Sequence, residues 1–237
     1  MSAAKSPAKT KRRDRDEVRP ARRAAADESG SAVKQVLMQT GPSGLLLGVG
    51  SSGVPLTVRL FRPQPTRVLV SARAYMQWIL IFRGVLLGAH VTILTQTPEA
   101  WDVLRNAVLR CGGTIDVTDN VADVPGQGRP YRPSLVVDDT ADSTGVRMGL
   151  GAWQAVLILN DLAANSVVHT LRACHMTIAS GVDARGVENL RRGYVLNAQQ
   201  LRLTNNMSEA EIVVALPRRL TRVSMPPTPV EYDLLFS

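Results

Sequence analysis

The hydrophobic positions of this sequence first form a pattern of two short strands. Apolar residues from Gly44 to Val49 and from Val54 to Phe61 flank a turn of small residues, Gly50 to Gly53, which is typical of a β-hairpin. The prolines of the following segment, Arg62 to Pro65, remove two donors from any strand ladder. We therefore expect this segment to separate the hairpin from the rest of the chain.

From residue 67 onward, runs of β-branched residues alternate with segments of helical spacing. Strand, helix and strand in succession imply parallel strands with right-handed connections, and two such units in a row predict a Rossmann-like layout. The expected strands are Arg67–Ser71, His90–Thr95, Thr114–Thr118, Ser134–Asp138, Gln154–Leu159, His175–Ala179, Gln200–Thr204 and Glu211–Leu216. The expected helices are Ala74–Leu87, a segment capped by Thr97 that stops at Gly112, a segment from Asn165 or Ser166 to Cys174, and Asp183–Arg192.

The predicted fold class is α/β, with a Rossmann-like and mostly parallel sheet preceded by a β-hairpin. Apolar residues make up 45% of the chain and aromatic residues only 4%, a balance that favours strands covered by helices over an all-helical bundle. Three regions follow from the patterns: a disordered basic arm (1–33), a β-hairpin extension (34–66) and a Rossmann-like α/β domain (67–237). Four prolines after residue 216 predict that this domain ends in an extended surface tail.

The first 30 residues hold nine Lys or Arg against five acids, so half of the formal charge of +8 lies in a segment with almost no bulky apolar residue. Such a segment cannot offset the entropy of its own ordering. It can contact an anionic membrane surface or nucleic acid by counterion release, or it can remain solvated without a ligand. Nucleic acid is the less expected ligand, because no aromatic residues are interleaved for base stacking. The candidate contact residues are Lys11, Arg12, Arg13, Arg15, Arg22 and Arg23.

The longest apolar run, Ala74 to Ala89, is too short for a membrane span and contains Arg83. It is predicted to be a buried helix. The first 30 residues contain no apolar stretch of the kind found in a signal peptide, which predicts a cytoplasmic location.

The sequence contains few residues that could form a catalytic or ligand-binding site. Asp138, Asp139 and Ser71 fall at the carboxyl ends of predicted strands, where open α/β sheets bind ligands. The paired acids could hold Mg²⁺ or act as acid and base, or they could simply end a strand and start a turn. The turn after Ser71 has no glycine that would let backbone amides approach a phosphate, which weakens a nucleotide hypothesis.

Other motifs favour ordinary structural roles. Gly48 to Gly53 matches G-x-G-x-x-G, but a strand rather than a helix is predicted to follow, so the match is interpreted as accidental. The three histidines (His90, His169, His175) are scattered along the sequence. The two cysteines, Cys111 and Cys174, have neither metal-ligand nor disulfide spacing. No catalytic residue, cofactor or metal is predicted.

Several of these segments together resemble a known family. GLLLGVGSSGVPLTVRLFRPQPTRVLV and FRGVLLGAHVTILTQTPEAW are similar to the C-terminal cytoplasmic region of EccE, a component of actinobacterial type VII (ESX) secretion machines. The shared features are the hairpin turn, the strand-helix-strand unit from Arg67 to Thr95 with Gly88-Ala89, and the early aromatic Trp101 of the next helix. Leu216 to Leu234 resembles the arginine-containing strand and proline-rich terminus of that family.

The resemblance implies membership of a membrane core complex beside EccB, EccC and EccD, with a Rossmann-like domain and no established catalytic residues. The family usually carries hydrophobic helices near its N-terminus, whereas this sequence has the basic arm there. The resulting hypothesis is a non-catalytic accessory subunit, not an enzyme, held peripherally at the inner face of the membrane. The alternatives are a nucleotide- or nucleotide-sugar-dependent enzyme and a nucleic-acid-binding protein. The oligomeric state stays open.

Overall fold

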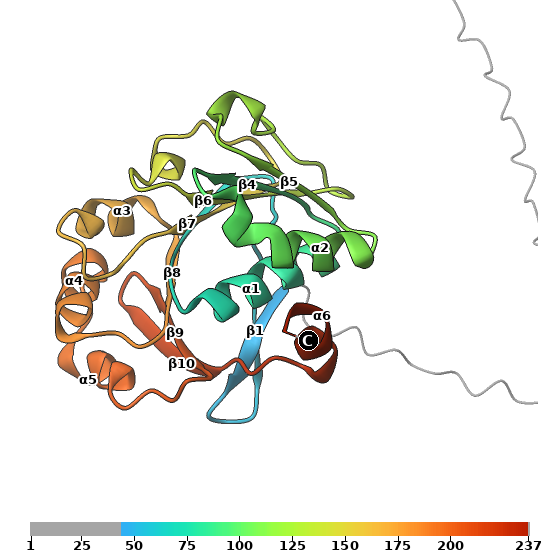
Figure 1. Ribbon diagram of the computed structural model, residues 1–237. Coiled ribbons are helices and arrows are strands. Elements are labelled where there is room, and N and C mark those ends of the chain that lie inside the picture. Colours follow the sequence, from blue (N-terminus) through green and yellow to red (C-terminus); the bar gives the residue numbers. More distant parts are fainter. Residues whose placement is uncertain (1–43, 237) are drawn as a thin grey trace, which may run out of the picture. The chain divides into compact units, whose positions relative to one another are not determined.

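A computed structural model describes residues 44–236. They form one sheet of ten strands in the order β2-β1-β10-β9-β8-β3-β7-β6-β4-β5. Figure 1 shows the sheet between its helices. The strands are β1 (Leu45–Gly50), β2 (Pro55–Val58), β3 (Thr66–Ser71), β4 (His90–Thr95), β5 (Thr114–Thr118), β6 (Ser134–Asp139), β7 (Gln154–Leu159), β8 (Met176–Ala179), β9 (Glu211–Leu216) and β10 (Arg219–Ser224). The prediction of an α/β fold with a mostly parallel sheet after a hairpin is confirmed.

Six of the strands are parallel and lie in the order β8-β3-β7-β6-β4-β5. Their sequences are nearly continuous apolar runs because helices cover both faces of a parallel sheet. The runs in β6 and β7 illustrate this, since five of the six residues of each are buried. β3 and β4 follow each other in the sequence but are not neighbours in the sheet, because β7 and β6 lie between them.

The other four strands extend the sheet on the side of β8 with antiparallel pairing. β9 pairs with β8, β10 with β9, and β1 with β10, so the hairpin of β1 and β2 belongs to the same sheet. Gly48 of β1 has φ +155, and a Cβ there would overlap the carbonyl oxygen of Ser224. Gly48, the first glycine of the G-x-G-x-x-G match, is therefore required because β1 and the end of β10 approach each other closely. The chain after Gly53 continues as β2 and not as a helix.

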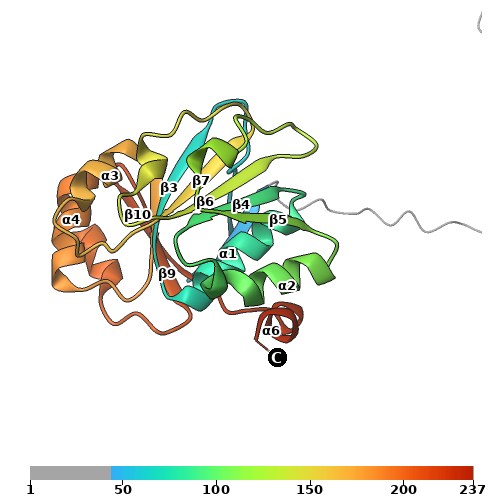
Figure 2. The same ribbon diagram turned by 45° about the horizontal axis from the view of Figure 1, so that its top comes forward.

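Two groups of helices cover the two faces of the sheet. Figure 1 and Figure 2 show α1, α2 and α6 on one side and α3, α4 and α5 on the other. Each group encloses its own buried apolar cluster, one around Phe82 of α1 and one around Leu190 of α4. The helices are α1 (Ala74–Leu86), α2 (Asp102–Arg110), α3 (Val167–Ala173), α4 (Ala184–Tyr194), α5 (Ala198–Leu201) and α6 (Pro229–Leu235); short 3₁₀ turns are η1 (Pro98–Trp101), η2 (Val121–Asp123), η3 (Thr144–Val146) and η4 (Arg202–Thr204).

The C-terminal third differs from the prediction in two places. Residues 200–204 are helical and not a strand, because Asn197 and Gln200 form a reciprocal capping box that starts α5. The predicted extended tail instead contains β10 and α6. A second capping box between Thr228 and Glu231, with Pro229 at the first helical position, starts α6.

A buried ion pair fastens α6 to the sheet. The Arg83 guanidinium donates from Nε to Glu231 Oε1 at 2.6 Å and from Nη2 to Oε2 at 2.9 Å. The same guanidinium donates to the carbonyl oxygens of Leu46 and Leu47 in β1. Both charged side chains are less than 10% exposed, so the charge of Arg83 within the apolar run is matched inside the fold.

Three smaller features concern the cap at Thr97, the two cysteines and the length of the helices. Thr97 precedes the helical region as expected but makes no capping hydrogen bond; its hydroxyl lies 3.3 Å from that of Thr95. Cys111 is exposed and Cys174 is buried, and burial raises the pKa of the Cys174 thiol to about 12. Among residues 44–236, no helix has the length and apolarity needed to cross a bilayer.

Candidate ligand site at the carboxyl edge of the sheet

The loops after β3 and β7 leave the sheet toward opposite faces. β3 leads into α1 on one face, whereas β7 leads through α3 on the other face to β8, which lies on the far side of β3. In open α/β sheets this divergence leaves a crevice beyond the carboxyl ends of the strands, and ligands bind there. The strand order therefore locates the candidate site before any side chain is considered.

A cavity of about 500 Å³ occupies this crevice. Its walls come from the ends of three neighbouring strands and the first turn of α1. The lining polar residues are Ser71, Arg73, Gln77, Asn160, Asp161 and Ser180. A cavity of this size is within the range of small-molecule sites.

Hydrogen bonds fix the shape of the cleft at its base. Ser71 Oγ accepts from the Leu162 amide at 3.0 Å, and Ser180 Oγ accepts from the Arg73 amide at 3.1 Å. Gln77 Nε2 donates to the carbonyl oxygen of Ala72 at 2.7 Å. Both hydroxyls keep a proton that they can donate, so the base of the cleft can present hydrogen-bond donors to an anion.

The N-terminus of α1 opens onto the same edge. The first amides of this 13-residue helix, those of Ala74 and Tyr75, precede its own hydrogen-bond ladder. The Arg73 guanidinium, immediately before them, makes a 3.1 Å ion pair with Glu209 in which both side chains are well exposed. Exposed pairs contribute about 0–1 kcal/mol, so a ligand anion can replace Glu209 at little cost.

A second cavity of about 340 Å³ adjoins the first and shares Asn160 with it. Asn160 Nδ2 donates to Ser143 Oγ at 2.6 Å, and His169 of α3 also lines this second cavity. Asn160, which follows β7, therefore separates the two cavities.

Asp138 does not line either cavity. Its side chain is fully buried, and Oδ1 accepts hydrogen bonds from the amide and hydroxyl of Thr140, while Oδ2 accepts from the Gly145 amide at 2.6 Å. All of these donors belong to the loop that follows β6. The structure therefore uses Asp138 to hold that loop.

Asp139 is likewise engaged within the fold. Its Oδ2 accepts from the Thr95 hydroxyl at 3.0 Å and from Trp101 Nε1 at 2.9 Å. These two hydrogen bonds join β6 to the end of β4 and to η1. Of the three ligand-edge candidates predicted from the sequence, the structure places only Ser71 in the cleft.

The histidines lie apart from one another. His90 contacts Thr114 and Asp116 at the amino edge of the sheet, and His175 Nδ1 accepts from the Arg67 amide. Burial, together with the positive charge of Arg62, lowers the pKa of His175.

Within residues 44–236, no group of three or more His, Cys, Asp or Glu side chains is placed to hold a metal ion. The six predicted anion contacts of the arm, Lys11 to Arg23, lie outside the described residues.

Comparison with known proteins gives a result only at the level of structure. No family model matches the sequence, and no curated protein matches it. The solved structure of VirB4 from Thermoanaerobacter pseudethanolicus matches with a TM-score of 0.54 at 11% identity, covering 81% of this chain and 98% of that one. The chain shares the fold of VirB4.

A weaker likeness extends to the genome packaging NTPase B204 of Sulfolobus turreted icosahedral virus 2. Its complex with AMPPCP has a TM-score of 0.48 at 8% identity and covers 70% of this chain and all of that one. The complex with AMP has the same TM-score at 9% identity.

The likeness to VirB4 corrects one prediction. The sequence predicts that the chain is not an enzyme, and that prediction is contradicted by the fold that the chain shares with VirB4. A scarcity of convergent polar residues in the sequence is no basis for excluding an enzyme, because strand order decides which residues converge.

Most of the cleft residues were not predicted from the sequence. Arg73 lies two residues after Ser71, and Asn160, Asp161 and Ser180 each follow a correctly predicted strand. The available signal was their position at strand ends, since the carboxyl ends of parallel strands share one edge. Which of those ends are neighbours depends on the strand order.

Proposed function

We propose that this protein is an EccE-like subunit of a type VII secretion machine whose α/β domain binds a phosphate-bearing ligand in the carboxyl-edge cleft. The observation that carries the ligand part is the placement of Arg73 and two side-chain hydroxyls around one cavity, next to the N-terminus of α1, at the point where the chain diverges. A nucleoside di- or triphosphate is the ligand that fits this cavity and the fold shared with VirB4.

The manner of binding differs from that of a glycine-rich phosphate loop. Only Ala72 and Arg73 separate the end of β3 from the start of α1, and neither is glycine. The ligand is therefore held mainly by side chains, with the Arg73 guanidinium as the principal cation. Hydrogen bonds that involve a charged group contribute about 1.5–3 kcal/mol each, which makes Arg73 the residue on which affinity depends most.

Replacement of Arg73 by alanine is expected to weaken nucleotide binding by about 10- to 150-fold, the factor that corresponds to loss of one such charged contact. Isothermal titration calorimetry of the full chain with ADP and ATP, with and without Mg²⁺, measures the effect. Arg105→Ala is the matched control, because Arg105 is exposed on α2, away from the cleft, and the change removes the same charge. Equal affinity of the two variants contradicts the assignment of the cleft, and absence of binding to the unmodified chain contradicts the ligand altogether.

The secretion part of the proposal rests on the family resemblance and on the structure of the residues that carry it. The hairpin turns at Gly50 to Gly53, α1 ends just before Gly88-Ala89, and β10 carries Arg219 and Arg222. EccB-, EccC- and EccD-like proteins are the proposed partners, with the domain at the cytoplasmic face of the membrane.

Co-purification tests this part independently of the ligand. The full chain, mixed with EccB-, EccC- and EccD-like proteins in detergent, is expected to elute with them from a size-exclusion column. A chain that elutes alone while the other three assemble contradicts membership of the complex. Membrane fractionation with the three partners present tests the peripheral location, which a fully soluble distribution would contradict.

A further inference from the structure

Two neighbouring surface residues have left-handed backbones at positions where glycine is the usual residue. Val195 follows the last turn of α4 with φ 54, and Arg218 lies in the two-residue turn between β9 and β10 with φ 60. Helices commonly end in glycine at this kind of position, and a turn with proline first usually has glycine second, as Pro217 would predict here. A β-branched residue with positive φ is a genuine outlier.

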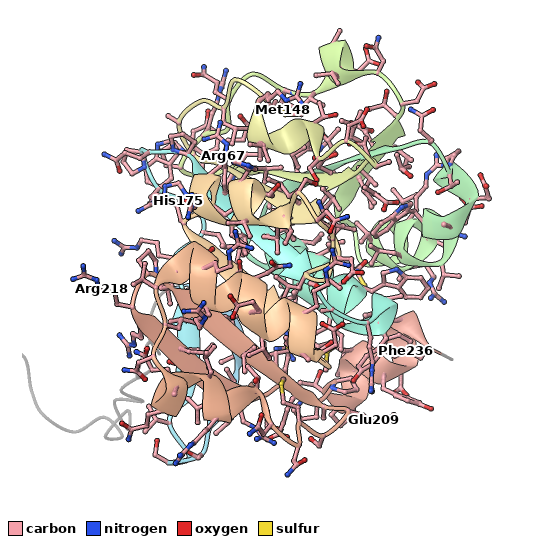
Figure 3. All side chains as sticks on the ribbon, turned by 90° about the vertical axis from the view of Figure 1, so that its left-hand side faces the viewer. Arg67, Met148, His175, Glu209, Arg218 and Phe236 are labelled. Atoms are coloured by element: carbon pink, nitrogen blue, oxygen red, sulfur yellow. The ribbon has the colours of Figure 1, made fainter. Side chains whose placement is uncertain are left out.

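Hydrogen bonds hold the backbone of Arg218 against Tyr194, the residue before Val195, and against Gln200 of α5. The Arg218 amide donates to the carbonyl oxygen of Tyr194 at 2.8 Å, and Gln200 Nε2 donates to the carbonyl oxygen of Arg218 at 2.6 Å. Their own side chains add nothing to the core, since Val195 is 71% exposed and Arg218 is exposed. Figure 3 shows Arg218 projecting away from the body of the domain. The strained backbones of Val195 and Arg218 therefore keep two side chains on the surface and add no buried contact.

Basic residues precede the exposed valine in the sequence. Arg191 and Arg192 lie in the last turn of α4, and Glu188 of that helix is paired with Arg191 at 2.7 Å. Within residues 44–236, neither Arg192 nor Arg218 forms an ion pair of its own, although the charge of Arg192 helps to lower the pKa of Glu188. Basic residues at a helix C-terminus complement its dipole, which accounts for Arg191 and Arg192 but not for Arg218.

We infer that Arg192, Val195 and Arg218, called here the α4 corner, form a docking surface for an acidic segment of a partner protein. Arginine forks bind carboxylates in a bidentate manner, and the exposed valine offers an apolar contact on the same part of the surface. Arginine beside an exposed apolar residue is typical of protein interfaces. Single-stranded nucleic acid fits less well, because the aromatic residue of α4, Tyr194, is buried and cannot stack on a base.

The α4 corner lies at the opposite edge of the sheet from the ligand cleft. β9 runs antiparallel to β8, so the start of β9 is at the carboxyl edge and its end, before Arg218, is at the amino edge. Figure 3 accordingly shows Glu209 and Arg218 on opposite sides. The inference therefore does not depend on nucleotide binding, and a partner can occupy the corner while the cleft is filled.

Stability measurements separate a docking role from a structural one. Glycine adopts left-handed backbone without strain, so Arg218→Gly is expected to raise the melting temperature by about 2–4 °C. Val195→Gly is expected to act in the same direction. A lower melting temperature for both variants would show that the side chains stabilise the fold, and would overturn the inference.

Binding measurements complete the test. The probe is a fluorescein-labelled peptide of twelve residues, mostly glutamate with two leucines, followed by fluorescence anisotropy with the full chain at 50 and 150 mM salt. Arg218→Gly and Arg192→Ala are each expected to lower its affinity at least 10-fold, whereas Arg105→Ala leaves it unchanged. Equal losses in all three variants, no binding of the peptide, or tighter binding of a 20-base-pair DNA duplex or of phosphatidylserine vesicles overturns the inference.

Discussion

Replacement of Asp138 by alanine is expected to lower the free energy of unfolding by roughly 3–5 kcal/mol, because three donors then lose their buried acceptor. The donors are the amide and hydroxyl of Thr140 and the amide of Gly145, and the Asp138 side chain is fully buried. Each unsatisfied buried donor costs about 1–3 kcal/mol. Urea denaturation followed by circular dichroism measures the loss, which should appear as a lower midpoint with the slope unchanged.

The control for this variant lies in the same loop. Asp142 is exposed, and Asp142→Ala is expected to stay within about 0.5 kcal/mol of the unmodified protein. If Asp138→Ala kept full stability and lost nucleotide affinity, Asp138 would be a ligand group and its role in holding the loop would be refuted. The pair of variants thus distinguishes the two roles that the sequence alone leaves open for this aspartate.

Loss of Arg83 is expected to be similarly damaging. Arg83→Ala leaves the carboxylate of Glu231 buried without its cation, and breaking one side of a buried ion pair costs about 3–5 kcal/mol. The carbonyl oxygens of Leu46 and Leu47 lose their donor in the same variant. The double variant Arg83→Met, Glu231→Met removes both charges, so it is expected to recover much of the loss in the same denaturation experiment. A double variant as unstable as Arg83→Ala would contradict this account.

The ion pair also predicts a dependence on pH. Burial acts to raise the pKa of Glu231, but hydrogen bonds from Arg83 and from the Thr228 amide outweigh it and hold the pKa below its usual value. A carboxyl with a depressed pKa in the folded state adds stability above its unfolded pKa and loses it as the pH falls through the folded value. The unmodified protein should therefore lose stability below about pH 4.5, and the double variant should lose less. Identical acid sensitivity would contradict this contribution of Glu231.

Sequence patterns were sufficient for the parallel strands and for β9, but not for β10 or for the helical segment at residues 198–204. β4 and β7 match their predicted ranges because both are rich in apolar and β-branched residues and five of the six residues of each are buried. In β10 only Leu220 and Val223 are buried, a spacing of three that does not resemble a strand. Leu201 and Leu203 alternate as in a strand, yet the capping box at Asn197 makes the segment helical. In this segment, the hydrogen bonds of the capping box outweigh the alternating pattern of hydrophobic residues.

The candidate site was only partly predictable for a related reason. Ser71 could be placed at a strand end from the sequence, and the structure puts it in the cleft. Asn160 and Ser180 reach the same cavity because β7 and β8 lie on either side of β3, an adjacency created by long-range pairing. Asp138 and Asp139 looked like ligands because acids at strand ends are common in sites, but the loop after β6 and Trp101 take up their oxygens.

The pairing of β1 with β10 joins residues separated by most of the described chain, since Val49 lies opposite Ser224. During synthesis, β1 leaves the ribosome well before β10, the strand that covers its inner edge. Arg83 must similarly wait for Glu231 before its charge is matched. A nascent chain therefore carries an open strand edge and an unmatched cation until residues 219–231 have emerged, and it is in this period that a chaperone would have most to protect.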